Sequence, residues 1–84
     1  MVYQINCSGI TSSKELHRLL ADTLSFPEWY GHNLDALYDC LTELAEPLRL
    51  HLNGWDSAAP WAPGFEAVLT AAQFENPELT VVFA

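Results

Sequence analysis

The sequence predicts an α/β protein with two layers, in which a three-stranded parallel sheet of strand order 1-2-3 carries three to four helices. Short apolar segments with strand character alternate along the chain with segments of helical periodicity. The connections between the strands are long enough for parallel crossovers, which are almost always right-handed. Residues 48–53 alternate between apolar and polar side chains, which indicates that only one sheet face is covered.

The first two elements are a strand at Val2–Cys7 and a helix that begins after Ser12. Ser12 and Glu15 match a capping box, in which a serine caps the helix and a glutamate follows three residues later. The helix should end near Ser25, with His17 toward its outer side. Its predicted core residues are Leu16, Leu19, Leu20 and Leu24.

A turn at residues 26–31 leads into a second, acidic helix, which is capped by Asn33 and closed by Pro47. At about 100° per residue, its core face holds Leu34, Leu37, Leu41, Leu44 and Ala45. The opposite face holds Asp35, Asp39, Thr42, Glu43 and Glu46. Tyr38 lies on the border between the two faces.

The acidic face contains no compensating cation, because no Lys or Arg occurs between Leu19 and Leu48. Carboxylates four residues apart repel one another by about 0.2–0.5 kcal/mol per pair, and those near the end of the helix oppose its dipole. The spacing of these carboxylates alone leaves two interpretations open: a solvated face on an acidic protein, or a docking surface for a strongly cationic partner.

The remaining elements are a strand at Leu48–Asn53, an irregular segment at Trp55–Pro63, a third helix, and a last strand at Leu79–Ala84. Trp55 and Trp61 are expected to cover the edges of the core. The third helix should end at residues 75–77. Its apolar side holds Phe65, Val68, Leu69 and Ala72.

Length and charge restrict the possible functions. The 84 residues are expected to form one domain, residues 1–84, with a modest core. The formal net charge of −8 argues against nucleic acid and against an anionic membrane surface, and it favours a basic protein partner. Cys7 and Cys40 are expected to be reduced thiols in the cytoplasm, because small secreted domains usually carry more bridges and no signal peptide is recognisable.

The sequence gives little indication of catalysis. No local motif places a histidine beside Cys40, so this residue is expected to be a small core residue rather than a nucleophile. His17, His32 and His51 lie on different elements without metal-ligand spacing and are expected to be solvated. No phosphate loop or nucleotide fingerprint occurs, so we expect no catalytic residue, metal or cofactor.

The segment at residues 24–43, LSFPEWYGHNLDALYDCLTE, resembles the barstar family of intracellular ribonuclease inhibitors. The resemblance rests on Pro-Glu, an aromatic pair and Gly, followed by Asn-Leu-Asp-Ala-Leu-aromatic-Asp-Cys-Leu. It extends more weakly over the rest of the chain. It implies the two-layer parallel fold described above. It also implies a cytoplasmic inhibitor or immunity protein that binds a basic, barnase-like ribonuclease one to one and is not itself an enzyme.

The resemblance also implies roles for particular residues. Asp39 would enter the phosphate subsite of the ribonuclease, Asp35 would pair with a second cationic group, and Trp29 would stack on an active-site side chain. The other residues implied in partner binding are Tyr30, Gly31, Asn33, Ala36, Tyr38, Thr42 and Glu43. The alternative is an adaptor of the same fold that binds a basic protein other than a nuclease.

Overall fold

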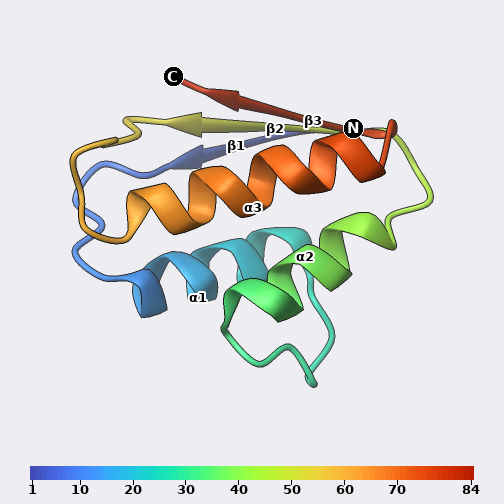
Figure 1. Cartoon of the computed structure of the whole chain (residues 1–84), viewed down its shortest axis with the longest axis horizontal. Coiled ribbons are helices and arrows are strands. Elements are labelled where there is room, and N and C mark those ends of the chain that lie inside the picture. Colours follow the sequence, from blue (N-terminus) through green and yellow to red (C-terminus); the bar gives the residue numbers. More distant parts are fainter.

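The computed structural model describes residues 1–84 and contains one parallel sheet with strand order β1-β2-β3 (Figure 1). The strands are β1 (Val2–Asn6), β2 (Leu48–Asn53) and β3 (Leu79–Phe83), and the helices are α1 (Ser13–Leu24), α2 (Leu34–Thr42) and α3 (Ala62–Glu75). All three helices lie on the same side of the sheet (Figure 1). The predicted fold class and strand order are therefore confirmed, with three helices.

The two faces of the sheet differ as the alternation in β2 predicts. The register places Ile5 beside Leu52 and Leu50 beside Val81, and all four side chains are buried under the helices. The opposite face carries no helix. It presents mostly polar side chains, among them Gln4, Asn6, Arg49, His51 and Thr80.

Helix α1 begins at the predicted cap but closes its first turn differently from the predicted capping box. The Ser12 Oγ accepts a hydrogen bond from the Glu15 N–H at 3.2 Å, as expected for an N-cap. The Glu15 carboxylate does not return to the cap, because its Oε2 accepts from the Thr11 hydroxyl at 2.9 Å. At the other end, the Ser25 N–H donates to the Ala21 carbonyl.

Ser25 adopts a left-handed backbone conformation, with φ of 55°. This conformation costs a residue with a Cβ about 1–2 kcal/mol, whereas glycine adopts it without that penalty. Ser25→Gly is therefore expected to raise the free energy of unfolding by about 0.5–1 kcal/mol, measured by urea denaturation. Ser13→Gly, inside α1, is the matched control and should lower it; a loss of stability in Ser25→Gly would contradict the argument.

Helix α2 ends at Thr42, so the prediction that it continues to Pro47 is wrong. The reason is a distant side chain: the Asn76 Nδ2 donates to the Leu41 carbonyl at 2.9 Å and to the Leu44 carbonyl at 3.1 Å. These contacts satisfy the Leu41 carbonyl in the last turn of α2, which would otherwise lack a partner, and the Leu44 carbonyl just beyond the helix. Glu43 therefore serves as the C-cap.

The core lies between the sheet and the helices and consists largely of leucine. Phe65 of α3 lies at the centre of this core and is 1% exposed. A Cβ on Gly64 would lie 3.0 Å from the Leu34 Cδ1, so glycine lets α3 approach α2 closely. Both cysteines are free and buried, as expected for core residues. None of the three helices is long and apolar enough to cross a membrane.

Aromatic side chains cover one end of the core. The rings of Trp55 and Phe83 lie 4.9 Å apart, and Trp61 packs edge-on against both Trp55 and Phe65. The Trp55 Nε1–H donates to the Glu66 Oε2 at 2.7 Å. The expectation that both tryptophans cover core edges is therefore confirmed.

Candidate protein-binding surface

The candidate surface is formed by α2 and the turn before it, which project away from the sheet (Figure 1). Asp35, Asp39 and Glu43 are exposed and follow one another at four-residue intervals, so they form one acidic row along the outside of α2. We call this row and the exposed residues of the turn the acidic surface. Glu46 is also exposed, but it lies beyond the end of the helix.

Asn33 fixes the start of α2 and thereby the position of the acidic row. Its Oδ1 accepts from the Ala36 N–H at 2.8 Å, and its Nδ2 donates to the Gly31 carbonyl at 3.4 Å. Asp35 follows in the first turn, where the helix dipole favours a negative charge. Gly31 and Asn33 are exposed at the edge of the surface, while Ala36 is half-buried.

Thr42 and Tyr38 flank the acidic row and are half-buried. The Thr42 hydroxyl donates to the Tyr38 carbonyl at 2.9 Å, so it closes the last turn of α2 from within. Tyr38 and Thr42 therefore lie beside Asp39 with part of each residue exposed.

Tyr30 lies beneath the acidic surface rather than on it, because its side chain is only 4% exposed. Its hydroxyl forms a hydrogen bond with the His17 Nδ1, and its ring lies 4.8 Å from that of Phe26. These contacts hold the turn against α1. The neighbouring Trp29 is 61% exposed and points outward. Trp29 is therefore available to a partner, and Tyr30 positions the turn that carries it.

The expectation that His17 is a solvated residue on the outer side of α1 is wrong. Its side chain is 4% exposed, and its ring lies 4.7 Å from that of Phe65. Burial is possible because the Tyr30 hydroxyl provides the hydrogen bond that water would otherwise supply. Helical periodicity gave no sign of this partner, which lies in the turn before α2.

The buried imidazole should make stability depend on pH. Burial lowers the pKa of His17 from its ordinary value of 6.5, and the charge of His32 lowers it further. The unfolded chain therefore binds a proton that the folded protein excludes, so stability is lost as the pH falls below about 6.5. We expect a loss of up to about 1.4 kcal/mol per pH unit until the folded pKa is reached.

Urea unfolding between about pH 7.5 and pH 5 measures this loss as the slope of the free energy of unfolding against pH. His17→Gln should flatten the slope, because it removes the titrating group. His51→Gln, which removes a half-buried imidazole from β2, is the matched control for the substitution. An unchanged slope in His17→Gln would show that His17 is not responsible.

The structure contains no group of three or more histidine, cysteine or acidic side chains that could hold a metal ion. Burial raises the pKa of the Cys40 thiol, and the nearby Glu43 and Asp39 carboxylates raise it further. Burial likewise raises the pKa of Cys7. Both thiols are therefore poor nucleophiles near neutral pH.

One part of the surface was not identified from the sequence. Residues of α3, namely Ala67, Val68 and Ala71, line a hollow together with Asp35, Tyr38 and Asp39. The sequence contains one sign of this extension: Phe74 falls outside the spacing of the core residues Phe65, Leu69 and Ala72, which implies an exposed aromatic side chain on α3.

Fold and surface together define a small two-layer parallel α/β protein that presents an acidic helix. A family model described as "Barstar (barnase inhibitor)" matches residues 1–83. The chain therefore belongs to the barstar family. Members of this family are inhibitors rather than enzymes, so the general role of the chain is that of a ribonuclease inhibitor.

A curated relative agrees with this assignment. The chain is 52% identical over 66 residues to a protein of Bacillus subtilis (strain 168) named "Putative ribonuclease inhibitor YrdF". The match covers 76% of this chain and 72% of the relative.

Proposed function

We propose that the chain inhibits a basic, barnase-like ribonuclease by covering its active site with the acidic surface, one inhibitor to one enzyme. In this role it is a cytoplasmic immunity protein that protects the cell from a secreted or delivered nuclease. The observation that carries the proposal is the acidic row of Asp35, Asp39 and Glu43, all exposed and without a lysine or arginine on the same helix.

The chemistry of a ribonuclease active site fits this row. Such a site binds RNA phosphates through cationic groups, and carboxylates on a rigid helix can occupy the same positions. Asp39, in the middle of the row, is the proposed anchor in the phosphate subsite, and Asp35 pairs with a second cation. Trp29 adds an exposed aromatic face that can stack on an active-site side chain.

Smaller contacts surround these anchors. The proposed rim consists of Gly31, Asn33, Ala36, Tyr38, Thr42 and Glu43. Tyr30 supports this surface from below and is not proposed as a contact, because it is buried.

An RNA-cleavage assay tests the proposal. Barnase, and any nuclease encoded beside the gene for this chain, is titrated with the purified chain at a fixed RNA concentration. Activity should fall linearly and reach zero at one equivalent, as expected for tight stoichiometric occlusion. Full nuclease activity with excess chain would refute inhibition. An end point at two equivalents would refute the proposed stoichiometry.

The association rate should depend strongly on salt. If the acidic row steers a basic enzyme, the association rate constant should fall at least about ten-fold between low ionic strength and about 0.5 M salt, while the dissociation rate changes little. Screening shortens the Debye length to about 8 Å at 0.15 M. Stopped-flow mixing with the ribonuclease measures both rates. An association rate that does not change with salt would contradict electrostatic docking.

A further inference from the structure

The outer side of α3 is unusually apolar for an exposed helix face. Its exposed or half-exposed positions include Pro63, Ala67, Thr70, Ala71 and Phe74. Phe74 is 90% exposed, more than any other large apolar side chain of the protein. Exposed helix faces are normally rich in charged side chains, so this face has the composition of a contact surface.

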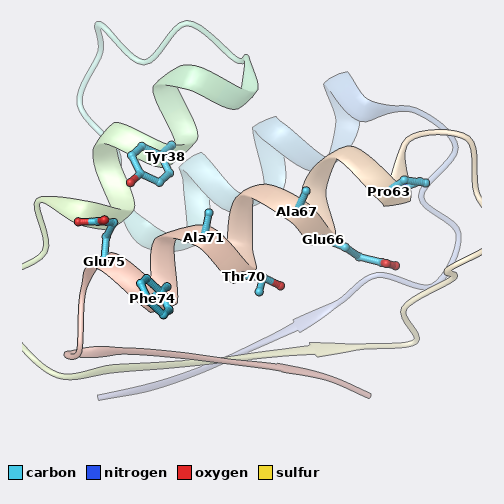
Figure 2. Close-up of a pocket in the computed structure, with 8 residues that line it drawn as sticks. All are labelled: Tyr38, Pro63, Glu66, Ala67, Thr70, Ala71, Phe74 and Glu75. Carbon is cyan, nitrogen blue, oxygen red and sulfur yellow. The ribbon is translucent and has the colours of Figure 1, made fainter.

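This face forms one wall of a groove of about 710 Å³, and Tyr38 of α2 projects over it (Figure 2). Ala67 and Ala71 point toward α2, and Phe74 lies at the end of the groove near Glu75 (Figure 2). Small side chains leave the space open between the two helices.

The groove continues into the acidic surface. A second hollow, of about 490 Å³, shares Tyr38, Ala67 and Ala71 with the groove and is also lined by Asp35 and Asp39. A partner seated on the acidic row therefore meets the groove at its margin.

The negative charge around the groove favours a positively charged occupant. The acidic side chains at its margins are Asp35, Asp39 and Glu75, and no lysine or arginine lines either hollow. Glu66 contributes less negative charge to the groove, because its carboxylate accepts a hydrogen bond from Trp55 and points away from Tyr38 (Figure 2). A second copy of this chain would bring a further net charge of −8 to the same place, so repulsion disfavours it. An apolar side chain flanked by lysine or arginine fits both the groove and its charge.

The size of an ordinary interface also requires more than α2. A helix of nine residues is about 14 Å long and about 10 Å wide, so one face of it spans roughly 140 Å². A stable protein complex buries about 800 Å² on each partner. The groove is the adjoining apolar surface that can supply part of the remaining area.

We propose that the α2–α3 groove binds an apolar side chain flanked by lysine or arginine, presented by a surface segment of the same ribonuclease beside its active site. This inference rests on the proposed function, and it assigns partner specificity to Ala67, Ala71 and Phe74. The acidic row recognises phosphate-binding cations, which ribonucleases of this kind share. The groove instead recognises a segment that can differ between them.

Two α3 variants test the groove in the ribonuclease assay. Phe74→Ala removes the exposed aromatic wall, and Ala71→Arg fills the groove with a cation; both positions are exposed, so folding is retained. Each should raise the inhibition constant about ten-fold. Val2→Ala, which truncates another exposed apolar side chain on the open sheet face, is the matched control and should leave it unchanged. Asp39→Ala is included because it tests the proposed function: it should abolish inhibition if the acidic row covers the active site.

The outcomes separate the two proposals. If Asp39→Ala abolishes inhibition while both α3 variants inhibit normally, the groove is not part of the interface and the occlusion proposal stands. If the chain sediments as a dimer that Phe74→Ala converts to a monomer, a second copy occupies the groove and the inference is overturned.

A peptide titration tests whether the groove binds an apolar side chain flanked by lysine, even if the ribonuclease used in the assay is not inhibited. The ¹⁵N-labelled chain is titrated with a synthetic amphipathic helix that has leucine on one face and lysine on the other, and with the same peptide carrying serine in place of leucine. The leucine peptide should shift the amide signals of Thr70, Ala71 and Phe74, and Phe74→Ala should weaken its binding about ten-fold. Equal binding of both peptides, or no effect of Phe74→Ala, would overturn the inference.

Discussion

Asp39→Ala is expected to raise the dissociation constant for the ribonuclease at least about 30-fold, corresponding to a loss of about 2 kcal/mol or more. In the proposed complex, the cationic subsite of the enzyme is desolvated, and the substitution leaves it without its counter-charge. The free energy of unfolding should change by no more than about 0.5 kcal/mol, since Asp39 is exposed and repelled by Asp35 and Glu43. Dissociation kinetics and urea denaturation measure the two effects separately.

Glu46→Ala is the matched control for Asp39→Ala. It removes the same charge from an exposed position beyond the end of α2, so it should slow association slightly and leave dissociation almost unchanged. Trp29→Ala should speed dissociation, because a stacked aromatic ring contributes only after docking. If Glu46→Ala speeds dissociation as much as Asp39→Ala, the interface is centred beyond the helix and the proposed anchor is wrong.

Asn76→Ala is expected to lower the free energy of unfolding by about 2–4 kcal/mol. Asn76 is 6% exposed, and its Nδ2 donates to the carbonyls of Leu41 and Leu44, while its Oδ1 accepts from the Glu78 N–H at 3.0 Å. Alanine removes all three contacts and leaves the Leu41 carbonyl buried without a partner. Urea denaturation followed by circular dichroism measures the change.

Asn53→Ala is the matched control for Asn76→Ala. The Asn53 side chain donates to the Gln4 Oε1 at 3.2 Å in an exposed position, where water can replace the lost bond. Its effect should stay within about 0.5 kcal/mol. If Asn76→Ala is as mild as Asn53→Ala, the end of α2 is held by its own residues and not by Asn76.

The parts of the fold that local pattern determines could be predicted from the sequence. Alternation gave β2 at Leu48–Asn53 with the observed bounds, and the asymmetry of its two sides predicted a sheet covered on one face. Ser12 and Asn33 cap their helices as predicted, because a cap depends on residues only two or three positions away. The exposure of Asp35 and Asp39 followed from the same periodicity.

The features that could not be predicted correctly depend on contacts with residues distant in sequence. Neither the hydrogen bond between His17 and Tyr30 nor the end of α2 at Thr42 through Asn76 has a local signature, although His17 stands three residues before Leu20 and therefore on the same side of α1. The groove requires α3 to lie beside α2, which the order of elements does not specify. At the end of α2, tertiary contacts overrode a local helical preference that continued toward Pro47. The acidic row was therefore predictable, whereas the supports beneath it and the apolar surface beside it were not.

The dependence of α2 on Asn76 has a consequence for protein synthesis. The acidic surface is encoded by residues 29–43, but the side chain that fixes the end of α2 lies at position 76, and the strand that pairs with β2 on its second edge follows at Leu79–Phe83. A ribosome-bound chain that has already exposed the whole acidic surface still lacks these contacts. The acidic surface therefore reaches its final geometry only after the residues up to Phe83 have left the ribosome, so its shape depends on a part of the chain that is made after the surface itself.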